Sequence, residues 1–295
     1  MTRCELCPRR CSINRAEGRK GYCQAGNALE VYRYGLHQGE EPPVSGTKGS
    51  GTVFFSRCTL SCVYCQNYPW SQEGQGRAIT VDELAEMLRS MAREGCHNWN
   101  LVSPTPWLPW IYEAWSRVVA DGLSRPIVYN TSGFERVDQL RAMAGWVNVY
   151  LSDLRYAENA SAGIGSDCVG YVDASRAALL EMWRQTGPMK LDREGVAEKG
   201  TICRILVLPG RANEAVANLE WLAESVGTEI PVSVMAQYTP AYKALSKEPW
   251  NRRPTQAEYD LVVEATERLG FYEGWIQEYE TPSQDSLLGF KMSPA

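Results

Sequence analysis

The chain has 295 residues, of which 44% are hydrophobic, and a formal net charge of −5 at pH 7. This length and composition predict one α/β domain of moderate size with a small appendage. The mild acidity argues against nucleic acid as a partner, because nucleic-acid-binding domains carry a basic excess. No run of about eighteen apolar residues occurs, and the first residues lack the apolar core of a secretory signal. We therefore expect no membrane span and a cytoplasmic location.

Residues 1–50 are rich in cysteine, arginine and glycine and show little periodicity. Cys4, Cys7, Cys11 and Cys23 form the pattern C-x2-C-x3-C-x11-C, a complete set of four thiolate ligands. Zinc sites usually pair two C-x2-C knuckles. Three close cysteines with a Cys–Pro step and one remote cysteine favour an iron–sulfur cluster. We predict a metal-binding segment here that holds either an iron–sulfur cluster or zinc.

Residues 51–280 alternate between strand and helix patterns and form the predicted main domain, followed by a polar tail at 281–295. The predicted strands cover 52–55, 99–102, 127–129, 147–151, 205–208 and 232–235. Such alternation predicts a parallel sheet with right-handed crossovers. Six units are too few to close a barrel of eight strands.

Three helices have clear boundaries in the sequence. Thr80 and Glu83 form a capping box that begins a helix, and Gly95 ends it. A second helix is predicted over 108–120. The last begins near Thr255, where the flanking proline and glutamate mark a helix start.

Cys58, Cys62 and Cys65 follow the first predicted strand with the spacing C-x3-C-x2-C. Three thiolates are one fewer than a closed [4Fe–4S] cluster takes. A cluster held by three would leave one iron open, as a catalytic zinc keeps one position free. The alternative of three unrelated buried cysteines is disfavoured, because free cysteines usually occur singly in cores.

This spacing, with Tyr64 just before the last cysteine, resembles the cluster motif of the radical S-adenosylmethionine (radical SAM) superfamily. The flanking runs SGTKGSGTVFF and QNYPWSQ, and the later NTSGFE, LVLPG and QYTPAY, resemble iron–sulfur proteins related to pyruvate formate-lyase activating enzyme. The resemblance covers nearly the whole chain. It implies a partial (β/α)6 barrel of the TIM type, with a [4Fe–4S] cluster on these three cysteines and S-adenosylmethionine as cofactor.

The same resemblance implies an oxidoreductase activity. The reduced cluster cleaves S-adenosylmethionine to a 5′-deoxyadenosyl radical, which abstracts hydrogen from a substrate. In the namesake activity that substrate is a glycyl residue of a partner protein. A low-potential electron donor such as flavodoxin or ferredoxin is also implied.

Polar residues follow the predicted strands at the edge where α/β folds place their chemistry. The predicted cofactor-binding residues are Ser103, Thr105, Asn130, Thr131, Ser132, Asp153, Arg155, Arg204 and Gln237. Ser103 and Thr105 stand where activating enzymes often carry Gly-Gly-Glu, so they either offer hydroxyls to the cofactor or form a proline-stiffened turn. The resemblance implies that Arg204 pairs with the cofactor carboxylate, a geometry that suits a guanidinium; the alternative is an internal acid such as Asp153.

Two other functions stay open at this stage. One is a different radical reaction, on another peptide or on a small molecule. The other is a noncatalytic iron–sulfur or zinc protein, which the missing Gly-Gly-Glu run leaves in contention. An assay for 5′-deoxyadenosine separates this last function from both enzymes.

Overall fold

The computed structural model describes residues 1–279 and 293–294, so most of the predicted polar tail lies outside the described residues. Seven parallel strands form its centre, in the spatial order β10-β9-β8-β6-β5-β4-β2. Their bounds are β2 (Ser50–Phe55), β4 (Trp99–Val102), β5 (Ile127–Thr131), β6 (Val149–Asp153), β8 (Ala197–Leu206), β9 (Val232–Met235) and β10 (Gly274–Ile276). The antiparallel strand β1 (Leu29–His37) pairs with β2.

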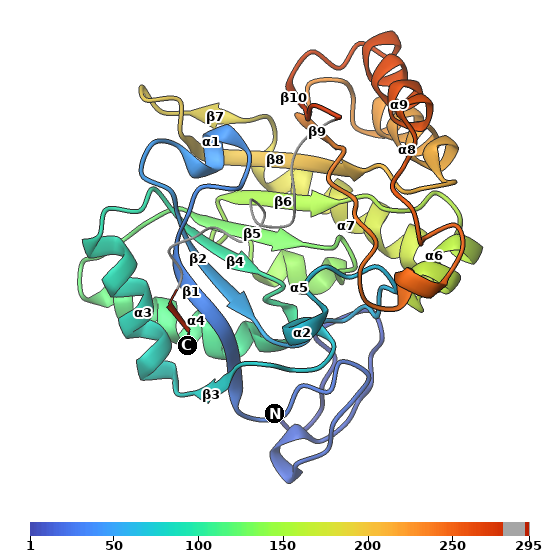
Figure 1. The fold of residues 1–295 in the computed structure, drawn as a ribbon. Coiled ribbons are helices and arrows are strands. Elements are labelled where there is room, and N and C mark those ends of the chain that lie inside the picture. The colour runs from blue at the N-terminus through green and yellow to red at the C-terminus, as the bar shows by residue number, and fades with distance from the viewer. Residues whose placement is uncertain (280–292, 295) are drawn as a thin grey trace.

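Nine α-helices and three short strands accompany this sheet in the described part of the chain. The helices are α1 (Pro42–Ser45), α2 (Tyr68–Ser71), α3 (Val81–Arg93), α4 (Leu108–Ala120), α5 (Val137–Ala142), α6 (Asn159–Ser166), α7 (Tyr171–Thr186), α8 (Ala212–Ser225) and α9 (Gln256–Arg268). Strands β3 (Arg77–Ile79) and β11 (Ser293–Pro294) pair with β1, and β7 (Lys190–Leu191) pairs with β8. Figure 1 shows the longer helices arranged around the outside of the curved sheet. Within the described residues, no helix combines the length and apolar character that a membrane crossing needs.

The predicted α/β fold with a mainly parallel sheet is confirmed. The capping box predicted at Thr80 is present and the helix start predicted near Thr255 forms a second box, since each threonine accepts a hydrogen bond from the glutamate amide three residues on. The strand predicted at 205–208 begins earlier, because the exposed Glu198 and Lys199 hide the apolar pattern of its first half. Strand β10 was not predicted, since three residues carry too little periodicity to register.

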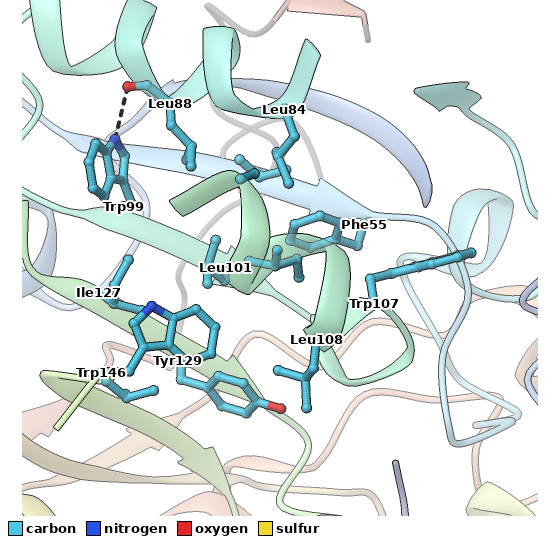
Figure 2. Close-up of a cluster of buried hydrophobic side chains, with 14 of the residues drawn as sticks. Phe55, Leu84, Leu88, Trp99, Leu101, Trp107, Leu108, Ile127, Tyr129 and Trp146 are labelled. Atoms are coloured by element: carbon cyan, nitrogen blue, oxygen red, sulfur yellow. Dashed lines mark hydrogen bonds between the residues drawn. The ribbon is translucent and has the colours of Figure 1, made fainter. Parts of the chain in front are cut away.

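Side chains alternate between the two faces of the parallel strands. Trp99, Leu101, Ile127 and Tyr129 point outward and pack with α3 and α4 in one buried cluster (Figure 2). The indole nitrogen of Trp99 donates to the carbonyl of Leu88 on α3 at 3.0 Å. Because the side-chain period of a strand is two, the residues between them face the inside of the curved sheet.

Helix α1 fills part of that inner space. Its Val44 is fully buried against inward-facing side chains, namely Val128, Val149, Leu151, Ala197 and Ile202. His37, at the end of β1, pairs with Ser50, the first residue of β2, so α1 lies near the starting ends of the parallel strands. Strand β1 therefore belongs to the same sheet as the main domain and α1 packs on its inner face, although the predicted Cys-rich segment extended to residue 50.

Candidate active site

A cavity of about 690 Å³ lies on the inner face of the sheet, within the size range of ligand pockets. Side chains at inward positions of four neighbouring strands line it, among them Asn130, Asp153, Arg204 and Ser233. Loops after the strands complete the wall, with Gln66, Asn67 and Tyr68 following the cysteine loop and Gln237 following β9. The cavity therefore opens where the parallel strands end, as in other α/β folds.

Most of the predicted cofactor-binding residues line this cavity. They are Ser103, Asn130, Thr131, Ser132, Asp153, Arg155, Arg204 and Gln237. Thr105 is absent from the wall, because its buried hydroxyl donates to Glu135 Oε1 at 2.6 Å. Ser103 has a positive φ of 56°, and Thr105 begins a short 3-10 helix. The Ser-Pro-Thr run is thus a strained turn that offers Ser103 alone to the cavity.

Cys58, Cys62 and Cys65 lie in the loop between β2 and α2. Burial and the neighbouring thiols raise the pKa of Cys58 to about 12 and that of Cys65 to about 11. Thiolate ligation at this loop therefore requires a compensating cation, which a bound metal supplies.

Each of the three sulfurs has a hydrogen-bonding partner within the chain. Cys62 Sγ accepts from Arg155 Nη1 and from Ser166 Oγ, both at 3.0 Å. Cys65 Sγ lies 3.1 Å from Ser71 Oγ, and Cys58 Sγ accepts from the Leu60 amide at 3.5 Å. Such contacts tune the potential of thiolate-bound clusters, so the donor set suits an iron–sulfur centre.

Arg155 connects the cysteine loop to the cavity. Besides its contact with Cys62, it donates to Asp153 Oδ2 from Nε at 3.0 Å and from Nη2 at 2.7 Å. Both residues line the cavity. The two predicted cofactor residues are therefore an ion pair beside Cys62, and the guanidinium charge lies between a carboxylate and a thiol.

Arg204 pairs with two glutamates from the segment before α1. It donates to Glu41 Oε1 at 2.8 Å and Oε2 at 2.7 Å, and it also contacts Glu40 Oε2. Its remaining contact is with Asn130 Oδ1 at 3.2 Å. Although burial opposes ionisation of Glu41, the Arg204 charge holds the pKa of that carboxyl below its usual value. The internal ion pair is therefore present, with Glu40 and Glu41 as the acids and with no direct bond to Asp153.

Sequence reasoning missed several residues of this cavity. Glu40 and Glu41 precede a Pro-Pro pair that begins α1. Proline at a helix start is the sequence signal that indicates this helix. His37 is 4% exposed, lines the cavity and has no partner at Nδ1. Burial lowers its pKa, so the ring is neutral at pH 7.

Glu135 is a buried acid behind the cavity wall. Its Oε1 accepts from the hydroxyls of Thr105 and Thr131, each at 2.6 Å. Burial raises its pKa to about 7, and these hydrogen bonds oppose the shift. The final glutamate of the NTSGFE run thus holds the Thr131 turn in place.

The N-terminal cysteines lie apart from this cavity. Cys4, Cys7, Cys11 and Cys23 line a separate, smaller cavity of about 20 Å³. Across the described residues, no group of three or more His, Cys, Asp or Glu side chains is placed so that it could hold a metal ion. The metal-ligand roles of both cysteine sets therefore stay predictions.

The fold and site define an α/β protein with an incomplete barrel and a polar cavity at the carboxyl ends of its strands. Residues 52–154 match the model of the Radical SAM superfamily. An uncharacterized protein of Methanocaldococcus jannaschii is 28% identical over 276 residues, which cover 90% of this chain and 74% of that protein.

Two solved structures are also similar. A radical SAM methyltransferase from Sphaerobacter thermophilus has 18% identity and a TM-score of 0.50, over 77% of this chain and 66% of that one. The FeFe-hydrogenase maturase HydG from Carboxydothermus hydrogenoformans has 14% identity and a TM-score of 0.48, over 72% of this chain and 49% of that one. The chain thus spans just under two thirds of the methyltransferase and about half of the maturase.

The matched segment begins in β2, contains the cysteine loop and ends next to Asp153. Through this segment the chain is similar to the Radical SAM superfamily, a class that implies a [4Fe–4S] cluster and S-adenosylmethionine. The methyltransferase supports the partial-barrel fold. The match supports radical chemistry on S-adenosylmethionine in general.

Proposed function

We propose that this protein is a radical SAM enzyme in which Cys58, Cys62 and Cys65 hold the [4Fe–4S] cluster and S-adenosylmethionine occupies the 690 Å³ cavity. The observation that carries the proposal is Arg155, which lines the cavity and donates to Cys62 Sγ at 3.0 Å. This contact joins the cluster loop to the cofactor cavity. When bound, the reduced cluster would give one electron to S-adenosylmethionine, which would leave as methionine and a 5′-deoxyadenosyl radical able to take a hydrogen atom from the substrate.

The residues of the chain bind and orient the cofactor. Arg155 and Asp153 present opposite charges next to Cys62, which suits a ligand with both an amine and a carboxylate. Asn130 and Thr131 offer polar groups from the end of β5. Glu40, Glu41 and Arg204 carry one surplus negative charge at the floor of the cavity, where a cationic group of a ligand is favoured.

As the finer function, we propose an activity like that of pyruvate formate-lyase activating enzyme, with hydrogen taken from a glycyl residue of a partner protein. The support is the resemblance of the motifs that flank the cysteines. A low-potential flavodoxin or ferredoxin would deliver the electron. The ten cysteines are all free, which suits a reducing compartment such as the cytoplasm.

The decisive experiment measures 5′-deoxyadenosine from S-adenosylmethionine and dithionite with anaerobically reconstituted protein. We expect production by the wild type and none by Cys58→Ala, Cys62→Ala or Cys65→Ala. Cys96→Ala is the matched control, since Cys96 is buried in the main core away from the cavity. Normal production by any of the three variants would contradict the ligand assignment. A silent wild type that holds its iron would favour the noncatalytic alternative.

The choice of substrate needs a separate measurement. A partner protein deuterated at glycine Cα should transfer deuterium into 5′-deoxyadenosine and acquire the spectrum of a glycyl radical. Transfer from a small molecule or from another residue of a peptide would instead establish one of the alternative radical reactions.

A further inference from the structure

We infer that Cys4, Cys7, Cys11 and Cys23 form a second metal centre, closed by four thiolates, beside the loop that carries Cys58. The four cysteines of the N-terminal lobe (residues 1–28) line one cavity of about 20 Å³. Among the described residues their side chains are not yet in ligand geometry, so metal binding would draw the four sulfurs together. Four thiolate ligands leave no open position, so this centre would bind metal without binding substrate.

The backbone of the lobe is shaped around these cysteines. Arg10 and Ser12, on either side of Cys11, have positive φ angles of 43° and 52°. A Cβ on Gly21 would lie 2.9 Å from Cys11 Sγ, so the chain approaches that sulfur as closely as glycine allows. Left-handed backbone at non-glycine residues is unfavourable and persists where the surroundings enforce it. A bound metal is such a constraint.

Arg15 supplies an independent observation. Its side chain is 1% exposed, lines the thiol cavity and stacks over two tryptophans. Nε and Nη1 donate to the carbonyls of Gly26 and Pro106, whereas Nη2 is buried without a hydrogen-bond partner.

A buried guanidinium needs an anionic partner. Among the residues that the structure describes, Arg15 makes no ion pair with a carboxylate. Four thiolates around Zn²⁺, or around a four-iron cluster in its usual oxidised state, carry a net negative charge. A metal–thiolate centre in the adjoining cavity therefore supplies the missing counter-charge.

The lobe also lacks an apolar core of its own. Within the described residues 1–28, Ala25 is the one hydrophobic residue that is fully buried. Segments of this size usually depend on disulfides or a metal, and all four cysteines are free thiols here. The composition of the lobe thus agrees with a metal-stabilised fold.

Its position places the centre next to the proposed [4Fe–4S] site. Arg9 donates from Nε to the carbonyl of Thr59 at 2.8 Å and from Nη2 to the carbonyl of Asp167 at 2.6 Å. Thr59 follows Cys58 and also lines the thiol cavity. An iron–sulfur centre here could pass electrons to the neighbouring cluster, whereas zinc would only fix the lobe against the cysteine loop.

The test compares metal content per chain in three anaerobically purified full-length variants. The triple variant Cys58→Ala/Cys62→Ala/Cys65→Ala should retain one centre, and Cys4→Ser/Cys7→Ser should lose that centre alone. Cys96→Ser is the control and should match the wild type. About one zinc without sulfide identifies a zinc site, and about four irons with acid-labile sulfide identify a cluster.

A triple variant that holds neither metal would overturn the inference, even if the double variant fails to fold. Loss of S-adenosylmethionine cleavage in the triple variant tests the proposed function separately. Arg15→Leu gives a second readout, since it should release the metal to a chelator several-fold faster than the exposed control Arg19→Leu does. Equal release rates would show that Arg15 does not stabilise the bound metal.

Discussion

At the scale of single residues, Arg204 shows how the cavity floor is assembled. Its side chain is 13% exposed and faces glutamates that are 8% and 5% exposed. Breaking a buried and hydrogen-bonded pair is far more costly than breaking a surface pair, because a charge is left without a partner. The floor therefore contributes to stability as well as to ligand recognition.

Arg204→Lys should destabilise the protein by about 2 kcal/mol, since lysine keeps the charge but loses the two-pronged contact with Glu41. Arg268→Lys is the control, because its exposed pair with Glu220 should contribute less than about 1 kcal/mol. Thermal melts of both variants measure the effect. If Arg204→Lys melts normally but binds S-adenosylmethionine weakly in calorimetric titration, the arginine is a cofactor clamp instead.

Glu135 predicts a pH dependence of stability. Burial raises its pKa from 4.5 to about 7, so the folded protein binds a proton more tightly than the unfolded chain. The resulting stabilisation, up to about 3 kcal/mol, is fully present below pH 4.5 and is lost as the pH rises through 7. Glu135→Gln keeps an oxygen for the two threonines but cannot ionise. The melting temperature of the wild type should therefore fall more steeply between pH 5 and 8 than that of the variant, and parallel curves would refute the assignment.

At the scale of elements, helix boundaries followed from local chemistry. The box of Thr80 and Glu83 predicted the start of α3, because both groups satisfy amide donors that no other part of the helix can reach. Strand β1 and helix α1 escaped prediction. Their burial depends on partners far along the chain, such as Val128 and Ile202 against Val44.

Thr80→Ala should lower the free energy of unfolding by about 1 kcal/mol, since it removes the acceptor for the Glu83 amide. Thr80→Ser retains that oxygen and should lose only a few tenths of this amount. Chemical denaturation of the two variants provides the comparison. Equal destabilisation would show that the methyl group of Thr80, rather than its hydroxyl, is the stabilising feature.

At the scale of the whole molecule, both cysteine sets lie towards one edge of the sheet. Residues 1–28 form a lobe at the lower edge of the view in Figure 1, near α2. Of these seven cysteines, Cys23 alone packs against the large core between the strands and α3 and α4. Metal loss should therefore loosen one edge and leave the core intact.

Hydrogen exchange of metal-loaded and metal-free protein tests this separation. Removal of metal should speed exchange in residues 1–28 and 56–66, whereas α3 and β4 should keep their protection. Uniform loss of protection would show instead that the metals hold the entire fold together.

The parts of the candidate site that follow from neighbouring residues in the sequence could be predicted. Eight of the nine predicted cofactor-binding residues line the cavity, whereas the ligand roles of Cys58, Cys62 and Cys65 stay predictions. The Pro-Pro helix start indicates a helix after Glu40 and Glu41 but not their place in the cavity, because that role arises from contacts with Arg204, which lies more than 160 residues away in sequence. A pattern of neighbouring residues carries no information about an ion pair between such distant segments.

The pairing of Glu41 with Arg204 also sets an order of events during synthesis. The two residues are 163 positions apart, so the acids emerge from the ribosome long before their cation. Until β8 is made, α1 lacks part of the inner face of the sheet against which it packs, and Arg204 is not yet present to pair with Glu40 and Glu41. Cluster delivery to Cys58, Cys62 and Cys65 can precede this moment, whereas stable capture of a small ligand must follow it. Loading of the protein is therefore expected to proceed in sequence, with metal first and the organic cofactor second.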